Sequence, residues 1–119
     1  MNSILILAHG SQIKETEAIV DSLVEKVKKR TGSELVQAAY LQFSEQDLES
    51  GIRQLSDKGA DSIKVVPMFI FDGVHVTQDI PGELEEIRAR YPDIKINLSR
   101  HIGDDDRLAD IITDRAASI

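Results

Sequence analysis

The stretch that decides the fold is Ile4-Leu5-Ile6-Leu7-Ala8-His9-Gly10-Ser11, close to the start of the chain. A short continuous apolar run is typical of a strand that is buried on both faces of a parallel sheet. Gly10 permits a tight turn after the strand, and Ser11 is a residue type that caps helices. The stretch therefore predicts a strand over residues 3–8 that leads through a turn into a helix.

The same alternation of strand and helix continues along the rest of the chain. After Ser11, apolar residues follow helical spacing until Gly32, beginning with Ile13 and Ile19. Capping and turn residues mark the starts of the later helices. Strands are predicted over residues 34–41, 62–70 and 94–98, and helices from Ser44 and Asp47 to Gly59, from Pro81, and after Asp104-Asp105-Asp106.

Strict alternation of this kind predicts an α/β fold with a parallel sheet and right-handed crossovers. We expect a single three-layer αβα domain over residues 1–119, with a four-stranded sheet in the order 2-1-3-4. In that order the first and third strands are neighbours at the point where the strand order reverses. Open α/β sheets bind ligands at the carboxyl edge of such a switch point.

The composition excludes several classes of function. Of the 119 residues, 41% are hydrophobic and 29% charged, and the net charge is −7. This negative charge argues against nucleic-acid binding and against attraction to anionic membranes. The chain has no cysteine, so thiolate metal sites and thiol catalysis are excluded. No signal peptide and no membrane-spanning run is recognisable in the sequence, so we expect a cytoplasmic protein.

Two histidines follow the strands that are predicted to be neighbours. His9 ends the first strand, and His75 lies in the loop after the third strand. If these strands are parallel and adjacent, both imidazoles project from the same edge of the sheet. Paired imidazoles suit a divalent transition metal, or the removal of protons near neutral pH.

Other interpretations of these positions remain open. A lone His9 would most often be a turn residue that is hydrogen-bonded to backbone. A phosphatase or phosphomutase with a phosphorylated histidine would favour an arginine beside it, whereas residue 8 is alanine. A receiver-like module would have Asp72 near the end of its third strand, but its acidic cluster after the first strand is replaced here by Ala8-His9-Gly10.

Three segments together resemble the small class II chelatases, the CbiX-type cobaltochelatases and their nickel-inserting archaeal relatives. The segments are Ala8-His9-Gly10-Ser11, the run from Val66 to Pro81, and Ile102-Gly103-Asp104-Asp105-Asp106-Arg107. The middle segment, with the pattern P-x-F-x-x-x-G-x-H-x-x-x-D-I-P, is the most specific. The resemblance extends over essentially the whole chain.

The resemblance implies a lyase that inserts Co²⁺ or Ni²⁺ into sirohydrochlorin in tetrapyrrole biosynthesis, of the cobalamin or nickel-tetrapyrrole type. His9 and His75 would bind the metal and help to remove protons from the macrocycle. Fe²⁺ is equally compatible with imidazole, and no cofactor is implied beyond the metal substrate. The short form is expected to be a homodimer, with larger relatives resembling a fused pair. A non-catalytic metal or tetrapyrrole carrier with the same two histidines is the alternative.

The resemblance also points to residues that contact the tetrapyrrole. Apolar side chains after the third strand would supply surface for the ring, although Phe69 is equally suited to the core. Arg107 would hold a carboxylate, or else pair with a neighbouring aspartate. Gln42 departs from the family pattern, because many relatives carry a glutamate there. If that glutamate assists metal delivery in the relatives, the role would be lost here or moved to Glu45 or Glu83. The expected substrate-binding residues are Ser11, Gln42, Phe69, Ile70, Phe71, Asp72, Gly73, Val74 and Arg107.

Overall fold

In the computed structural model, a four-stranded parallel sheet forms the centre of the molecule. The structure describes residues 1–71 and 73–119, with the side chains of His75 and Val76 outside that description. The strand order is β2-β1-β3-β4, as predicted. The strands are β1 (Asn2–Ala8), β2 (Val36–Tyr40), β3 (Ser62–Pro67) and β4 (Lys95–Leu98).

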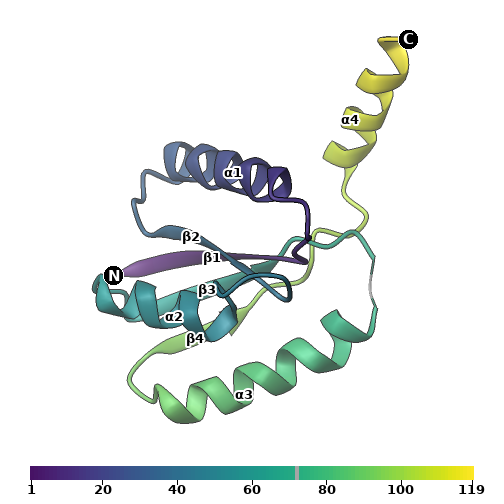
Figure 1. The fold of residues 1–119 in the computed structure, drawn as a ribbon. Helices are drawn as coiled ribbons and strands as arrows, with labels where there is room; N and C mark the ends of the chain where they lie inside the picture. Colours follow the sequence, from purple (N-terminus) through teal and green to yellow (C-terminus); the bar gives the residue numbers. More distant parts are fainter. Residues whose placement is uncertain (72) are drawn as a thin grey trace.

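Helices lie on both faces of this sheet, which confirms the three-layer prediction (Figure 1). α1 (Glu15–Thr31) covers one face, and α2 (Leu48–Asp57) and α3 (Ile80–Arg90) cover the other. A short π-helical segment, η1 (His75–Asp79), leads directly into α3, and α4 (Asp106–Ala117) is the last element.

The two faces of the sheet bury different side chains, because alternate residues of a strand point to opposite faces. Leu5 and Leu7 of β1 pack with α2 and α3, whereas Ile6 and Ala8 pack with Val20 of α1. The central strand is therefore buried on both faces, as its continuous apolar sequence predicted. This burial fixes the position at which His9 leaves the sheet.

The first helix begins later than the sequence predicted. α1 starts at Glu15, and the Ser11 hydroxyl accepts a hydrogen bond from the Ile13 amide at 3.1 Å within a local turn. The prediction that Ser11 caps this helix is therefore wrong, because the hydroxyl closes its own turn instead. Ile13 precedes the helix and Ile19 lies on its outer side, so both are exposed.

The segment after the third strand also differs from the prediction. β3 ends at Pro67 rather than at residue 70, and residues 75–79 form η1 rather than a loop. Thr77 stabilises this turn, since its amide and its hydroxyl both donate to the Gly73 carbonyl at 3.0 Å. Helical backbone through Asp79 continues into α3, so Asp79 does not cap that helix with its side chain.

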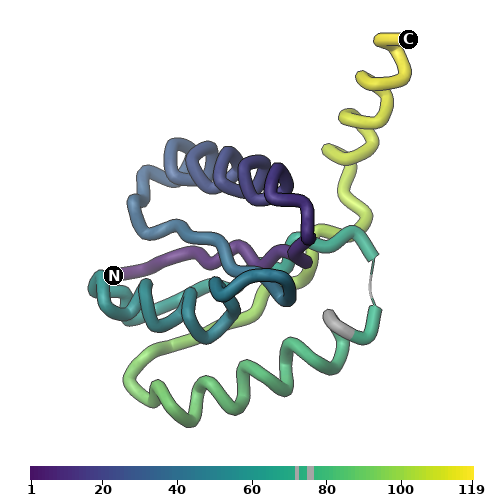
Figure 2. Tube along the Cα trace, viewed as in Figure 1, coloured from purple at the N-terminus to yellow at the C-terminus, as the bar shows by residue number. Residues whose placement is uncertain are grey.

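α4 leaves the body of the protein and points away from it (Figure 2). It covers neither face of the sheet, and none of its residues, all of which the structure describes, is buried. Its apolar positions nevertheless have the spacing of a core-facing helix. The sequence pattern therefore predicted the helix correctly but not its exposure.

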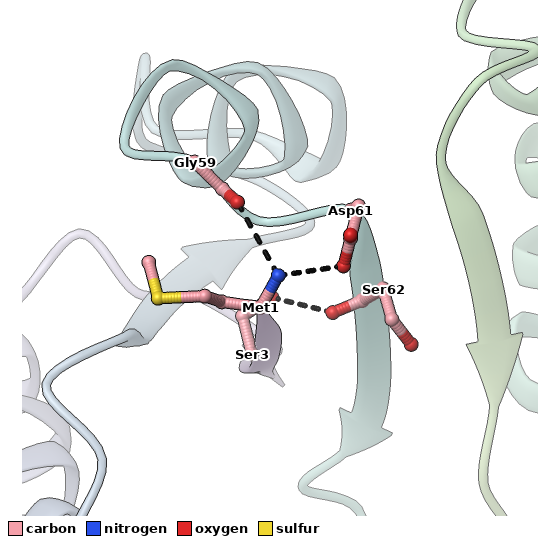
Figure 3. A network of polar contacts seen from close by, with 5 residues as sticks. All are labelled: Met1, Ser3, Gly59, Asp61 and Ser62. Atoms are coloured by element: carbon pink, nitrogen blue, oxygen red, sulfur yellow. Dashed lines mark hydrogen bonds and ion pairs between the residues drawn. The ribbon is translucent and has the colours of Figure 1, made fainter.

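Polar contacts hold the amino end of β1 (Figure 3). His9 follows the opposite, carboxyl, end of this strand. The amino group of Met1 pairs with Asp61 at 2.7 Å and also reaches the Gly59 carbonyl at 3.5 Å. The Ser3 hydroxyl donates to the Ser62 carbonyl at 3.1 Å. The ammonium group of Met1 lowers the pKa of the Asp61 carboxyl.

None of the helices that the structure describes is both long enough and apolar enough to cross a bilayer.

Candidate functional site

His9 leaves the carboxyl edge of the sheet directly after β1, and its side chain is exposed. Its ring meets Phe69 edge to face, with the ring centroids 5.6 Å apart and the planes at 88°. Phe69 also packs against the core between the sheet and α2–α3. Phe69 therefore connects the core to the imidazole of His9.

The turn that carries His9 fits closely against the loop after β2. Gly10 has a φ of +94°, and a Cβ atom at this position would lie 2.1 Å from the Gln42 carbonyl oxygen. The Leu41 amide donates to the Ala8 carbonyl at 3.0 Å, which holds the same loop against β1. Only glycine fits this position, and the close approach places Gln42 beside the His9 turn.

Phe43 is a residue that the sequence analysis did not identify. It has a φ of +59°, in the left-handed region that phenylalanine rarely adopts, and 56% of it is exposed. An exposed aromatic ring on strained backbone is typical of functional loops. No pattern in the sequence marks this position, because phenylalanine is not a residue type that favours positive φ.

The segment that carries His75 leaves the same edge of the sheet. β3 is parallel to β1 and hydrogen-bonded to it, and the Met68 amide continues the pairing by donating to the Leu7 carbonyl at 2.8 Å. The backbone of His75 begins η1, eight positions after the last residue of β3. The His75 side chain and all of Asp72 lie outside the described residues, so the distance between the two imidazoles stays untested.

Three of the predicted substrate-binding residues form exposed apolar surface after β3. Ile70 is 57% exposed, Phe71 83% and Val74 61%. Gly73 is exposed as well, and among the described atoms outside its chain neighbours none lies within 4 Å of its Cβ position. This part of the edge offers uncovered apolar area beside the His9–Phe69 pair, as a flat hydrophobic ligand requires.

The loop between β4 and α4 completes this edge. The Gly103 amide donates to the Phe69 carbonyl at 3.1 Å, which fixes the loop beside the residue that touches His9. Arg100, His101 and Arg107 surround a hollow of about 430 Å³ at the base of α4. The three basic side chains that flank the last strand are thus gathered beside the candidate site.

Arg107 is engaged within this loop. Its Nε and one terminal nitrogen donate to the two carboxylate oxygens of Asp105, at 2.7 and 2.8 Å. Asp105 also accepts from the Arg107 amide at 2.9 Å and so caps α4. The Arg107 guanidinium and amide hold the pKa of the Asp105 carboxyl well below its usual range. The ion pair with a neighbouring aspartate, one of the two interpretations open from the sequence, is present.

The two acids considered as replacements for the glutamate absent at Gln42 lie in different surroundings. Glu45 lines a hollow together with Lys14 and Phe43. Glu83 lies on α3, and partial burial raises the pKa of its carboxyl. The nearby negative charges of Asp47, Glu49 and Glu86 raise this pKa further, whereas the positive charge of Arg90 lowers it. Within the part of the chain that the structure describes, no three histidine or acidic side chains gather as metal ligands.

Comparison with known proteins assigns the family. A sequence model of the CbiX family matches residues 3–119. The chain belongs to the CbiX family. A sirohydrochlorin cobaltochelatase of Sulfurisphaera tokodaii is 31% identical over the whole of this chain and 94% of that protein. A sirohydrochlorin ferrochelatase of Priestia megaterium is 28% identical over 97% of this chain.

The CbiX relatives fall into two lengths. This chain spans only 43% of the Priestia megaterium ferrochelatase, in contrast to nearly all of the Sulfurisphaera protein. The cobalt complex of the sirohydrochlorin chelatase SirB from Bacillus subtilis subspecies spizizenii superposes with a TM-score of 0.91 and 28% identity. That superposition covers 99% of this chain but 50% of the SirB chain, so the longer protein has about one further chain's length beside the matched half.

Proposed function

We propose that this CbiX protein is a sirohydrochlorin chelatase that inserts a divalent metal, Co²⁺ or Ni²⁺ or Fe²⁺, into the macrocycle. The observation that carries the proposal is the pairing of β1 with β3, which brings the His9 turn and the segment of His75 to one edge of the sheet. The named cobaltochelatase and ferrochelatase relatives support the same reaction. The metal and sirohydrochlorin are both substrates.

The proposed reaction needs groups that bind a metal and also accept protons. Sirohydrochlorin loses two N–H protons as the metal ion sheds water and enters the ring. A neutral imidazole binds Co²⁺, Ni²⁺ or Fe²⁺ through one nitrogen and accepts a proton near pH 7. We assign both tasks to His9 and His75, with the edge-to-face contact between Phe69 and His9 helping to orient the His9 ring.

The surroundings of His9 suit a flat, acidic ligand. Ile70, Phe71 and Val74 offer exposed apolar surface for the plane of the ring. Arg100 and the remaining guanidinium nitrogen of Arg107 offer cationic groups for its carboxylates. Ser11 and Gln42, on the other side of His9, supply polar hydrogen-bonding groups. Asp72 and Gly73 complete the set of proposed contacts.

We further propose that the protein works as a homodimer. The support is the difference in length between its relatives, since two copies of this chain would match the length of one longer relative. A tetrapyrrole is broad compared with an edge formed by two strand ends. A second copy would cover the face of the ring that one chain leaves open.

A multiple-turnover assay tests the proposed reaction. Sirohydrochlorin in tenfold or greater excess over protein would be mixed with Co²⁺, Ni²⁺ or Fe²⁺, and the absorption spectrum of the macrocycle followed against a protein-free control. We expect complete conversion of the excess sirohydrochlorin with at least one metal. Conversion that stops at one equivalent per protein would indicate a carrier, and no acceleration would contradict the proposal.

A further inference from the structure

Phe43 adopts an unfavourable backbone conformation without burying its ring. Its φ of +59° lies in the left-handed region, where the Cβ atom of a residue other than glycine crowds the backbone. Phenylalanine has no polar side-chain atom that could form a compensating local hydrogen bond, and 56% of the residue is exposed. Neither local hydrogen bonding nor burial in the core therefore accounts for a phenylalanine at this position.

The loop that carries Phe43 is held by hydrogen bonds on either side of it. The Tyr40 amide donates to the Gln46 carbonyl at 2.8 Å, which closes the loop at its base. Within the loop, the Ser44 hydroxyl accepts a hydrogen bond from the Gln46 amide at 3.0 Å. Phe43 lies midway between Tyr40 and Gln46, so these contacts maintain its strained conformation, as the surroundings of functional sites do elsewhere.

Phe43 lies at the carboxyl edge of the sheet, on the β2 side of His9. The carbonyl that meets the Cβ position of Gly10 belongs to the peptide bond between Gln42 and Phe43, so Phe43 adjoins the turn that carries His9. β3 lies on the other side of β1, and the exposed Phe71 follows it. Exposed aromatic side chains therefore follow the strands on both sides of the one that leads to His9.

The hollow beside Phe43 suits the acidic substituents of a tetrapyrrole. It has a volume of about 630 Å³, and the cationic side chains of Lys14 and Arg53 line it together with Phe43. A carboxylate that reaches this hollow can accept charge-assisted hydrogen bonds from either cation. The acids Glu17 and Glu45 line the same hollow, so its individual cations, rather than its net charge, would hold a carboxylate.

We infer that Phe43 is a macrocycle-binding residue of the proposed chelatase, and that its ring packs against sirohydrochlorin on the β2 side of His9. Aromatic rings that pack in offset or edge-to-face arrangements attract each other beyond the apolar area that they cover. The fixed loop presents the ring before the ligand arrives, which lowers the ordering cost of binding. The inference rests on the proposed function, because it names a residue that recognises the substrate of that reaction.

Titration of the protein with metal-free sirohydrochlorin, with no metal present, tests Phe43. Phe43→Asn removes the ring at a position where asparagine tolerates positive φ, so we expect the Kd for sirohydrochlorin to rise at least about fivefold, with an equal or higher Tm. Phe43→Trp keeps an aromatic ring and should retain the affinity of the unaltered chain. Ile19→Asn is the matched control: it changes an exposed apolar side chain on the outer side of α1 and should leave the Kd unchanged.

Two further measurements separate ring binding from a structural role. Co²⁺ titration without sirohydrochlorin should give the same affinity for Phe43→Asn as for the unaltered chain, because Phe43 has no metal-binding atom. A role in supporting the turn of Gly10 and His9 would instead weaken Co²⁺ binding. Sedimentation should show the same oligomeric state for both proteins, since the ring is assigned to the ligand and not to a second protein.

Several results would overturn the inference. These are a smaller rise in the Kd of Phe43→Asn, a lower Tm, weaker Co²⁺ binding or a changed oligomeric state. An equal loss of affinity in Phe43→Trp would also contradict packing of an aromatic ring on the macrocycle. If the unaltered chain binds no sirohydrochlorin, the proposed function fails together with this inference. If the unaltered chain and Phe43→Asn bind it equally well, only this inference fails.

Discussion

The ring of Phe69 meets the imidazole of His9 edge to face, at 5.6 Å between centroids, and the Phe69 carbonyl accepts a hydrogen bond from Gly103. One residue thus touches the proposed metal ligand, the core and the loop that leads to α4. This edge-to-face contact contributes to the orientation of the His9 imidazole at the edge of the sheet. The arrangement makes Phe69 a positioning residue rather than a ligand.

Phe69→Leu should slow metal insertion while the fold persists. Leucine fills most of the volume against the core but has no ring for the imidazole to meet. An edge-to-face pair contributes about 0.5–1.5 kcal/mol, so we expect a decrease of roughly 2- to 10-fold in insertion rate. Steady-state assays at saturating Co²⁺ check this. An unchanged rate would show that the ring contact does not position His9.

Gly10→Ala should destabilise the protein by at least about 2 kcal/mol, because its Cβ would clash with the Gln42 carbonyl and because φ is positive. Gly32→Ala is the matched control. Gly32 also has positive φ, +71°, but no atom of the described residues lies within 4 Å of its Cβ position, so we expect a loss of about 1 kcal/mol in the free energy of unfolding. Urea unfolding measures both. Equal losses for the two variants would contradict the close approach of the two loops.

Gln42→Glu should lower the metal concentration needed for half-maximal insertion, because a carboxylate beside the His9 turn attracts the cation. The effect should be modest, since Gln42 is exposed and water screens the charge. It should fade as the pH falls through about 4–5, the usual range for a glutamate carboxyl. If the metal dependence is unchanged over roughly pH 5–8, residue 42 does not take part in metal delivery.

Glu83→Gln should stabilise the protein at pH 7. The raised pKa of the Glu83 carboxyl means that folding disfavours its ionised form, so its contribution to stability falls as the pH rises above its usual value of 4.5. Because much of the side chain still faces solvent, which screens the neighbouring charges, we expect a gain of about 0.5 kcal/mol or less, absent below about pH 4. Glu85→Gln, which removes an ion pair with Arg88 on the same helix, should give no gain. A gain equal at pH 4 and pH 7 would rule out the electrostatic cause.

His75→Ala should abolish insertion, with a decrease of at least about 100-fold, because one proposed ligand and proton acceptor is lost. We expect the free energy of unfolding to change by less than about 1 kcal/mol, since His75 begins η1 at the carboxyl edge of the sheet and not within the core. His101→Ala, in the β4–α4 loop, is the matched histidine control and should retain insertion. Full turnover by His75→Ala would remove this residue from the mechanism.

The sheet could be predicted from the sequence because its signals are local. Residues 4–8 are apolar without interruption, as a strand buried on both faces must be, and alternating helices leave little choice of topology. The position of the candidate site at the carboxyl edge of the sheet follows from that topology, since neighbouring parallel strands end at the same side. The capping-box start predicted from Ser44 and Asp47 is only partly present: the Asp47 carboxylate caps α2 by accepting from the Ser50 amide at 2.9 Å, whereas the Ser44 hydroxyl accepts from the Gln46 amide at 3.0 Å in a local turn.

The features that the sequence did not predict depend either on competition between local hydrogen bonds or on contacts between distant parts of the chain. The Ser11 hydroxyl closes a local turn instead of capping α1. Both arrangements use the same hydroxyl, so the residue type alone does not decide between them. The positive φ of Phe43 arises where its loop packs against Gly10, which residue type alone does not indicate. The spacing of Leu108, Ile111 and Ile112 is typical of a packed helix face, yet no residue of α4 is buried.

The pairing of His9 with His75 on one metal ion is the central claim, and anomalous diffraction from crystals grown with Co²⁺ tests it most directly. We expect a cobalt peak at the carboxyl edge of β1 and β3, with a ring nitrogen of each histidine about 2.1 Å from the metal. A cobalt ion bound by only one of these histidines, or held elsewhere on the protein, would contradict the two-histidine site.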